Sequence, residues 1–378
     1  MVERIVAPMS LQGQLDKSSG RLMSLDALRG FDMFWIIGGG VIFRELLGRE
    51  TSNEFLKSLL LQLKHVRWEG FHFWDLIMPL FLFVVGAAMP FSFSKRLARG
   101  DSKKQLYFHI FKRVAILCFL ALITKRQLQT FDFANMHFFT STLQAIAMGY
   151  LITSIVILNM RVGWQVITMT VLLLLYWALV ALVPVPGYGA GVFTEDGNLV
   201  TYLDNLILGR RQLGTGFRII SLMTFGCTVL LGALAGQLLR SQRSQKTKVI
   251  WLFAAGVGCL VLGLAWDTWL PIIKMIWTSS FVLFAAGWSY LLLALFYLVI
   301  DVWGFRKWAF GFVVIGMNAI AVYMATRLFN FRHVGDIFVG NLGKWLGQWN
   351  DFVQAVAAFA VIWLILYWMY SKKSFIKI

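Results

Sequence analysis

The sequence predicts an all-α integral membrane protein, a polytopic bundle of about ten transmembrane helices with both termini cytoplasmic. Composition is the first reason, because 59% of the 378 residues are hydrophobic and 14% are charged, against about 25% charged in an ordinary soluble domain. The mean hydropathy of +0.71 agrees with this composition. The apolar residues also form long continuous runs, whereas a membrane barrel shows alternating segments of about 10 residues. These observations exclude a soluble enzyme, and the 16% aromatic content excludes intrinsic disorder.

The chain contains ten apolar segments close to the roughly 20 residues that one span requires. In order they are 23–43, 72–93, 106–124, 137–159, 162–183, 217–239, 248–267, 276–300, 308–329 and 352–370. The first is the least hydrophobic, because Asp26, Arg29 and Asp32 interrupt it. We therefore expect a cytoplasmic N-terminal segment (1–22), a single membrane domain (23–370) and a cytoplasmic tail (371–378).

The distribution of basic residues predicts the orientation. The net charge is +17, from 35 Lys and Arg against 18 Asp and Glu. In a soluble chain this excess would suggest nucleic acid, but membrane proteins concentrate Lys and Arg in cytoplasmic loops. With the N-terminus inside, the inner segments hold most of the excess, for example Lys95, Arg96, Arg99, Lys103 and Lys104. We expect the lipid bilayer as a partner, no nucleic acid, and both termini in the cytoplasm.

Three segments outside the spans are long. Residues 44–71 join the first two spans, and residues 184–216, which contain Pro184 and Pro186, join the fifth and sixth. Residues 330–351 are too polar to span and are expected at the outer interface.

Charged residues inside the spans indicate either structural pairing or a ligand site, because a charge at the bilayer centre costs about 2.5–3.5 kcal/mol. Asp26, Arg29 and Asp32 are spaced by three residues, which places them on roughly one helix face. His109, Lys112 and Arg113 share one face of the third span, beside the basic loop. Guanidinium and ammonium groups suit phosphate. A cluster that contacts lipid headgroups is the alternative.

The segment that leads into the second span carries His65, and Asp75 follows ten residues later. An imidazole exchanges protons near neutral pH and can also act as a nucleophile. A surface histidine without a chemical role is the ordinary alternative. No pair of histidines has the spacing of metal ligands, so we expect no metal.

Several motifs resemble a known family. The segment Arg21–Gly30 resembles the R-x-x-S-x-D-x-x-R-G opening of a transmembrane acyltransferase superfamily. The block His65-x-x-Trp68-x-Gly70, followed by Asp75-Leu-Ile-Met-Pro79, resembles the second-helix block of the heparan-α-glucosaminide N-acetyltransferase family. Weaker matches are Leu143-Gln144-x-Ile146-Ala147, Lys274-x-x-Trp277-Thr-Ser-Ser and Gly316-Met-Asn318-Ala. The resemblance covers nearly all of residues 21–370 and is closest to the bacterial branch, which lacks the lumenal domain.

The resemblance implies a reaction and a location. Acetyl-CoA or CoA would bind from the cytoplasm as co-substrate, and the acetyl group would pass to the amine of a glucosamine-type sugar or glycan on the other side of a bacterial inner membrane. His65 matches the catalytic histidine of the family, either as a base or as a transient acetyl carrier, and Asp75 would orient it. A possible homodimer is implied by the resemblance alone.

The remaining site residues are assigned on the same resemblance and on charge. The expected contacts of the co-substrate are Arg29, Lys112, Arg113, Asn318 and Gln144. The expected contacts of the acceptor are Trp68, Glu69 and Asp26. The sequence departs from the family before the glycine run of the first span, where an asparagine is common and this chain reads Trp35-Ile36-Ile37-Gly38. Asn318 and Gln144 are the candidates to replace that asparagine.

Two other functions fit a helical bundle with interior charges. An amino-sugar transporter would need a polar passage, and transporters often contain broken helices in two corresponding halves. Only Pro79 is expected to break a span here, which favours the enzyme. A membrane scaffold would have no use for buried charges.

Overall fold

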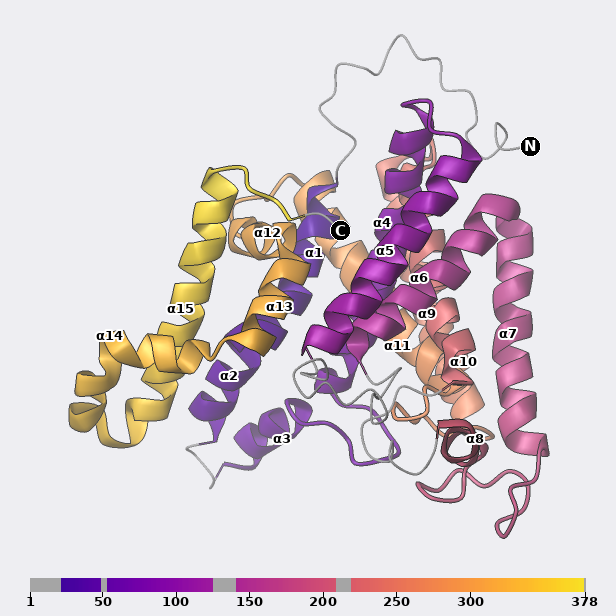
Figure 1. Ribbon diagram of the computed structural model, residues 1–378, viewed down its shortest axis with the longest axis horizontal. Helices are drawn as coiled ribbons and strands as arrows, with labels where there is room; N and C mark the ends of the chain where they lie inside the picture. Colours follow the sequence, from indigo (N-terminus) through magenta and orange to yellow (C-terminus); the bar gives the residue numbers. More distant parts are fainter. Residues whose placement is uncertain (1–21, 49–52, 125–140, 209–218, 377–378) are drawn as a thin grey trace. The chain divides into compact units, whose positions relative to one another are not determined.

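The computed structural model describes residues 22–48, 53–124, 141–208 and 219–376 (Figure 1). Within these ranges the chain forms helices and isolated bridges, without a strand. Among the described residues, eight helices are long and apolar enough to cross a membrane, and there are nine if a bent pair of shorter helices counts as one span. The predicted class, an all-α multi-pass membrane protein, is confirmed. The orientation of the termini stays a prediction.

The chain divides into two compact units, which are described separately. Unit 1 comprises Met1–Leu22, Trp68–Gly70 and Met78–Ala294, and unit 2 comprises Met23–Arg67, Phe71–Ile77 and Leu295–Ile378. The single domain expected over 23–370 remains a prediction about folding. Of the segment 1–22 only Leu22 lies within the described residues.

Unit 1 contains most of the long helices. Its long helices are α4 (Phe73–Leu97, from Met78 onward), α5 (Lys103–Thr124), α6 (Thr142–Asn159), α7 (Val162–Leu182), α9 (Ser221–Arg240), α10 (Gln245–Asp267) and α11 (Ser279–Phe296, up to Ala294), and it also contains the short helix α8 (Leu199–Leu208). These helices match predicted spans two to eight, except α8, which lies in the loop 184–216. The predicted starts at 137–140 and 217–218 fall outside the described residues.

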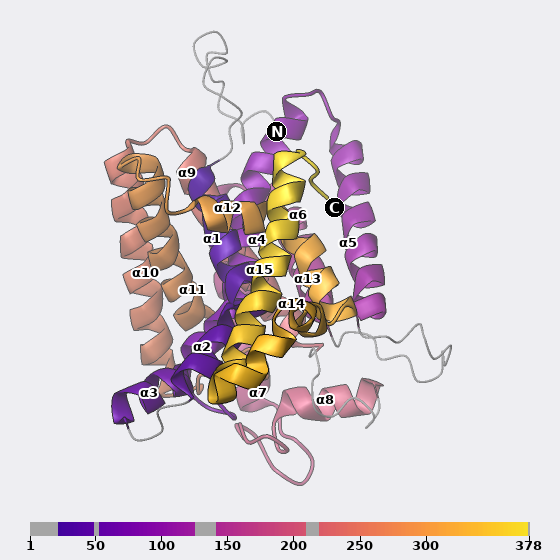
Figure 2. The same cartoon turned by 90° about the vertical axis from the view of Figure 1, so that its left-hand side faces the viewer.

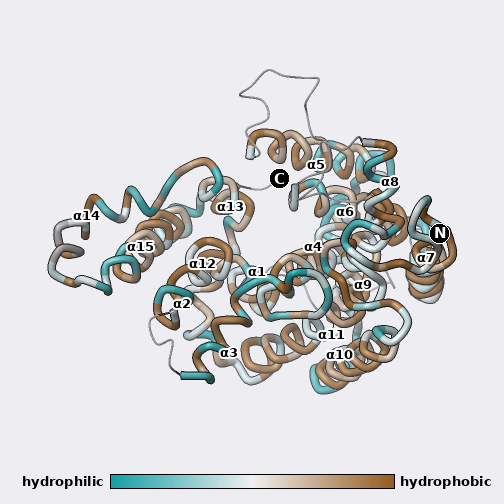
Figure 3. Tube along the Cα trace, turned by 90° about the horizontal axis from the view of Figure 1, so that it is seen from below, coloured by the Kyte–Doolittle hydropathy of each residue, from teal (hydrophilic) through white to brown (hydrophobic). Residues whose placement is uncertain are grey.

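Small residues set the packing of unit 1. A Cβ at Gly232 of α9 would lie 1.9 Å from the Phe83 carbonyl oxygen of α4, and one at Gly236 would lie 2.2 Å from that of Ala87. Membrane helices use such small-residue pairs because close backbone approach is their main source of packing energy. Glycines also join α10 to α11, which lie side by side in Figure 2. The residues of α10 are largely apolar, as the brown colour in Figure 3 shows, and many of them are exposed, which suits contact with lipid.

Unit 2 begins with the first predicted span, which is broken into three pieces. They are α1 (Met23–Phe34), a π-helical turn (Trp35–Gly39) and α2 (Gly40–Leu47). Gly38 leaves the helical conformation with φ 171° and ψ −32°. The interior charges and this break explain why the segment is not among the eight long apolar helices. The short helix α3 (Glu54–Gln62) and the first turn of α4 follow.

The C-terminal part of unit 2 packs against α1. Its elements are a π-helical end of α11 (Tyr297–Val302), α12 (Phe310–Met317), α13 (Ala319–Leu328), α14 (Phe331–Leu346), a 3₁₀ turn (Gly347–Trp349) and α15 (Asn350–Ser371). The helices α12 and α13 form the bent pair, with an angle of 73° at Asn318. A Cβ at Gly30 of α1 would lie 1.7 Å from the Phe312 carbonyl oxygen, so α1 and α12 are in close contact. The helices α14 and α15 form a hairpin (Figure 1).

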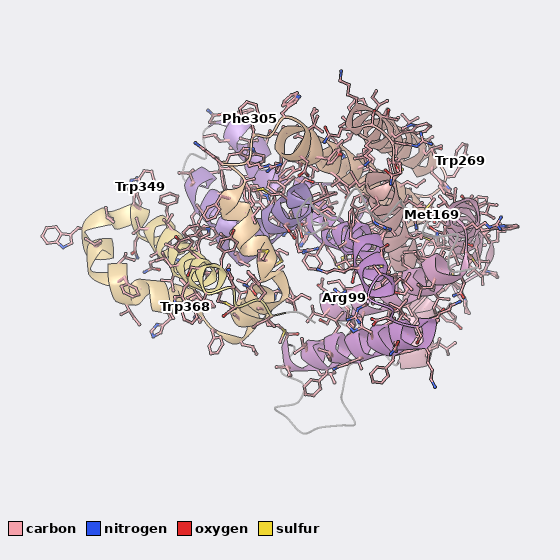
Figure 4. All side chains as sticks on the ribbon, turned by 90° about the horizontal axis from the view of Figure 1, so that it is seen from above. Arg99, Met169, Trp269, Phe305, Trp349 and Trp368 are labelled. Carbon is pink, nitrogen blue, oxygen red and sulfur yellow. The ribbon has the colours of Figure 1, made fainter. Side chains whose placement is uncertain are left out.

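Exposed aromatic residues lie near the ends of the long helices. Trp269 follows α10, Phe305 follows α11, Trp349 precedes α15 and Trp368 lies near its end (Figure 4). Amphipathic aromatic rings are enriched where membrane meets water. Their positions agree with spans that end at these points.

Candidate active site

A histidine–aspartate pair lies at the N-terminus of α4. His65 Nδ1 is 2.7 Å from Asp75 Oδ1. The two residues belong to unit 2 and come from the loop after α3 and from the first turn of α4. The contact that the sequence suggested between these residues is present.

The Asp75 carboxylate is buried and fixed by the backbone around it. Its side chain is 1% exposed. Its Oδ2 accepts hydrogen bonds from the backbone N–H of Val66 at 3.1 Å and of His72 at 3.2 Å. The bond to His72 is the return half of a capping box, in which an acidic residue in the first helical turn satisfies an N–H group that the helix leaves open. Asp75 therefore holds both the helix start and the histidine loop.

The contact with Asp75 fixes the roles of the two ring nitrogens of His65. Because the carboxylate only accepts hydrogen bonds, Nδ1 is the donor and Nε2 carries the lone pair of the ring. The side chain is 57% exposed, so a ligand can reach it. A histidine held by a buried carboxylate in one tautomer is equipped to accept a proton or attack a carbonyl carbon.

Trp74 forms a wall beside this pair. Its ring centroid lies 6.4 Å from that of His65. The guanidinium carbon of Arg44 lies 4.9 Å from the Trp74 ring centroid, in cation–π geometry. A Cβ at Gly40 would lie 2.2 Å from the Trp74 ring, so the glycine gives the indole its space. Neither Trp74 nor Arg44 was predicted from the sequence, although the glycine run was a signal for close approach.

Trp68 and Glu69 belong to unit 1 and are held by contacts within it. The Trp68 indole donates a hydrogen bond of 2.7 Å to the Phe193 carbonyl oxygen. Glu69 forms a backbone bridge with Ile273, and the Gly70 N–H donates to the Ile272 carbonyl oxygen at 2.9 Å. Gly70 has φ 110°, a conformation that favours glycine. These contacts fix the segment that follows the histidine, and binding of the acceptor by Trp68 and Glu69 stays a prediction.

The helix α1 carries three charged residues, and two of them form an ion pair. Arg29 and Asp26 form an ion pair at 3.4 Å. A Cβ at Gly316 would lie 2.0 Å from the Asp26 carbonyl oxygen, which places this part of α1 against α12. Both carboxylate oxygens of Asp32 are buried and have no hydrogen-bond partner among the described residues.

The basic residues of α5 form a cluster in unit 1. The Arg113 guanidinium lies 4.5 Å from the Tyr150 ring centroid, and its Nε is buried without a hydrogen-bond partner in the described ranges. Lys112 is exposed. Arg96 of α4 joins the cluster, because its guanidinium lies 3.1 Å from the His109 ring nitrogens and from Asp101. From the sequence, Arg96 was predicted only as part of the inner loop.

Gln144 and Asn318 have structural hydrogen bonds. The Gln144 side chain accepts from the Ser141 N–H at 3.2 Å and completes a capping box at the start of α6. Asn318 lies at the bend between α12 and α13. Its side chain accepts from the Ile376 N–H at 3.0 Å and donates to the Ser374 carbonyl oxygen at 3.3 Å. These bonds tie both amides to nearby backbone, and their roles as co-substrate contacts stay predictions.

Comparison with known proteins bears on this geometry. Residues 21–155 match the family described as Domain of unknown function (DUF5009), and this range includes both His65 and Asp75. The mouse protein "Heparan-alpha-glucosaminide N-acetyltransferase" is 24% identical over 96% of this chain. The chain resembles heparan-α-glucosaminide N-acetyltransferases. The resemblance proposed from the motifs is thereby confirmed.

The human protein of the same name is also 24% identical, over 95% of this chain. The chain spans about three fifths of the length of these relatives, 61% of the mouse protein and 60% of the human one. The similarity covers both units and both members of the histidine–aspartate pair. It therefore concerns the helical bundle as a whole and not an isolated motif.

Proposed function

We propose that this protein is a membrane acetyltransferase that transfers an acetyl group from acetyl-CoA to the amine of a glucosamine-type acceptor. The observation that carries the proposal is the 2.7 Å contact between an exposed histidine and a buried, backbone-held aspartate. This pair lies in the block that resembles a family of N-acetyltransferases. The similarity of nearly the whole chain to heparan-α-glucosaminide N-acetyltransferases supports the same reaction class.

The residues at the site suffice for the proton transfers of this reaction. An ammonium group cannot attack a thioester until it loses a proton, and His65 Nε2 takes that proton. The neutral nitrogen attacks the carbonyl carbon, the C–N bond forms, and the C–S bond breaks to release the thiolate of CoA. The nitrogen loses its second proton as the thiolate gains one, so one proton is released overall. Asp75 stabilises the imidazolium and holds the neutral imidazole in one tautomer.

A second route through the same residues uses His65 as the nucleophile. In that route Nε2 attacks the thioester carbon, the C–S bond breaks, and CoA leaves as the thiolate. The deprotonated amine then attacks the acetyl-imidazolium and the bond between Nε2 and the acetyl group breaks. Of the two protons that the ammonium loses, one goes to the CoA thiolate and the other is released. The two routes differ in one observable. Incubation with acetyl-CoA in the absence of acceptor leaves an acetylated His65 only in the second route, and mass spectrometry of the quenched protein detects it.

The basic cluster of α4 and α5 is the proposed contact for the phosphates of CoA. Lys112 is exposed, and Arg113 retains a buried Nε–H without a hydrogen-bond partner in the described part of the chain. Charge-assisted hydrogen bonds from such groups to phosphate are strong. Arg29 is a further candidate at the start of α1. By the positive-inside rule the end of α4 and α5 that carries the basic cluster faces the cytoplasm. We infer that acetyl-CoA binds on that side and that the acceptor lies on the other side of a bacterial inner membrane.

An amino-sugar transporter is the second candidate. Broken helices are typical of transporters, and the described part of the chain contains two, the π-helical turn at Trp35–Gly39 and the 73° bend at Asn318. Neither break involves a proline, so neither was predicted from the sequence. The break that was expected at Pro79 is wrong, because Pro79 lies inside the continuous helix α4. The histidine–aspartate pair has no required part in transport, which favours the enzyme.

Proteoliposomes distinguish the two functions. Vesicles receive purified protein, [¹⁴C]acetyl-CoA on one side and glucosamine on the other. The enzyme yields labelled N-acetylglucosamine on the acceptor side, and His65→Ala vesicles yield none. Movement of labelled glucosamine without acetylation would replace the enzyme by the transporter. Purified protein that shows no thermal stabilisation by CoA at millimolar concentration would also contradict the acetyltransferase.

A further inference from the structure

The Asp32 carboxylate has no use in the mechanism above. Its side chain is fully buried, and neither oxygen has a hydrogen-bond partner in the described residues. The neighbouring Arg29 pairs with Asp26 at 3.4 Å. A buried carboxylate without a partner is unfavourable, and ionisable groups inside membrane bundles commonly belong to a binding site. Asp32 is therefore a candidate contact for a ligand that donates hydrogen bonds.

Helix geometry shows which side of α1 carries this carboxylate. Gly30 faces α12, because a Cβ there would lie 1.7 Å from the Phe312 carbonyl oxygen. At 3.6 residues per turn, Asp32 is rotated by about 200° from Gly30. Asp32 is thus on the side of α1 opposite α12.

Trp35 shows what lies on that side. It follows Asp32 by three residues, close to one helical turn. Its ring centroid lies 5.0 Å from that of Phe73, the first residue of α4. Asp75 follows two residues later, bound to His65. All of these residues belong to unit 2, so the side of α1 that bears Asp32 faces the helix start that holds the histidine–aspartate pair.

Trp35 also supplies a second polar group. Its indole Nε1 is buried and lacks a hydrogen-bond partner within the described ranges. An indole N–H only donates, whereas a carboxylate only accepts. A ligand that satisfies both groups carries a cationic or N–H donor beside an oxygen acceptor. An amino sugar has this combination, with an amino group next to hydroxyl oxygens.

We propose that Asp32 is the subsite that binds the amino group of the acceptor, and that Trp35 Nε1 donates to an adjacent sugar oxygen. The inference rests on the proposed function and specifies how the acceptor is recognised. In the resting complex the carboxylate holds the ammonium beside His65. During attack the nitrogen becomes positively charged as the C–N bond forms, and the same carboxylate stabilises that charge.

The test compares two sugars that differ at the amino group. Equilibrium binding of glucosamine and of glucose is measured for the wild-type protein and for Asp32→Asn. The wild type should prefer glucosamine by roughly 10- to 100-fold, the range expected for hydrogen bonds to a charged group. Asp32→Asn should bring the two affinities within about twofold while binding of CoA is unchanged. Retention of the preference in Asp32→Asn overturns the proposal, as does its absence from the wild type.

A matched control is Asp204→Asn. Asp204 is another buried carboxylate, in α8 of unit 1, and accepts a hydrogen bond from the Ile219 N–H at 3.0 Å. This variant should keep the preference for glucosamine. If Asp32→Asn does not fold, Trp35→Phe provides an independent measurement. It should weaken glucosamine and glucose alike by several-fold, because only the contact to oxygen is lost. Unchanged affinity in Trp35→Phe would overturn the proposal.

Acetyl transfer separates this inference from the proposed function. A wild-type protein that prefers glucosamine through Asp32 but transfers no acetyl group refutes the enzyme and keeps the subsite. A wild-type protein that acetylates glucosamine, with an unchanged KM for glucosamine in Asp32→Asn, refutes the subsite and keeps the enzyme.

Discussion

At the scale of single residues, the two members of the histidine–aspartate pair have different roles: His65 is the proposed reactive group, and Asp75 holds it in place. His65 is largely exposed, whereas Asp75 is buried and accepts hydrogen bonds from two backbone N–H groups. Substitution of the two residues should therefore have different effects on activity and on folding.

Replacement of His65 by alanine should remove acetyl transfer with little effect on stability. General acid–base catalysis contributes about 10²–10⁴-fold, so kcat should fall by at least that factor. The melting temperature should stay close to that of the wild type because the side chain is 57% exposed. His333→Ala, an exposed histidine on α14, is the control and should leave kcat unchanged. Wild-type activity in His65→Ala would exclude this residue from the reaction.

Replacement of Asp75 by asparagine should lower both activity and stability. The amide can no longer hold the imidazole in one tautomer, so kcat should fall by about 10²-fold or more while the KM for acetyl-CoA changes little. The loss of charged hydrogen bonds to Val66 and His72 should cost about 1–3 kcal/mol, measured by thermal or denaturant unfolding. A purely structural residue would lower stability and leave kcat per folded molecule intact.

At the scale of the elements, glycine contacts decide how closely the helices approach. Gly232 of α9 meets the backbone of α4, whereas a Cβ added at Gly258 of α10 would have nothing within 4 Å. The two glycines lie in helices of comparable length and apolar character. They form a matched pair for measuring the energy of close approach.

Gly232→Ala should destabilise the protein by about 1–3 kcal/mol, because the added Cβ would lie 1.9 Å from the Phe83 carbonyl oxygen and the helices must separate. Gly258→Ala should be neutral or slightly stabilising, since alanine favours a helix more than glycine does. Unfolding in detergent measures both. Equal effects of the two substitutions would contradict the packing role of Gly232.

The long helices could be predicted from the sequence, because the thickness of the bilayer imposes one length on every span. The short helices α3 and α8 could not be predicted in this way, since their apolar runs are shorter than one membrane span. The break at Gly38 was also missed, although the glycine run marked the place. His65 and Asp75 were found by resemblance and spacing, but ten residues of chain do not by themselves bring the two side chains into contact. The segment that follows His65 is held by a hydrogen bond from Trp68 to Phe193, 125 residues away. Sequence spacing does not specify such an anchor.

At the scale of the whole molecule, the direction of the proposed acetyl transfer depends on the orientation of the chain in the membrane. The basic cluster of Arg96, Lys112 and Arg113 lies toward the end that the positive-inside rule assigns to the cytoplasm. In the proposed reaction acetyl-CoA is supplied from the cytoplasm, so this end is where the donor would enter. The orientation can be tested without any assay of function.

Reporters fused to the C-terminus should locate it in the cytoplasm. A fluorescent protein that matures only in the cytoplasm should be bright after Ile378, and alkaline phosphatase fused there should be inactive. Fusion in the segment 184–216 should give the reverse result, because five spans precede it. An active phosphatase at the C-terminus would invert the topology and place the basic cluster outside.

Asp75 both contacts His65 and stabilises the start of α4, so the two residues of the pair are expected to be lost at different rates in evolution. A lineage released from selection for acetylation could discard His65 at almost no energetic penalty, yet the aspartate would persist because the first turn of α4 still needs it. Paralogues that have become inactive should therefore carry the acid without the imidazole. The position of His65, and not that of Asp75, therefore indicates whether a distant homologue is an active enzyme or an inactive one.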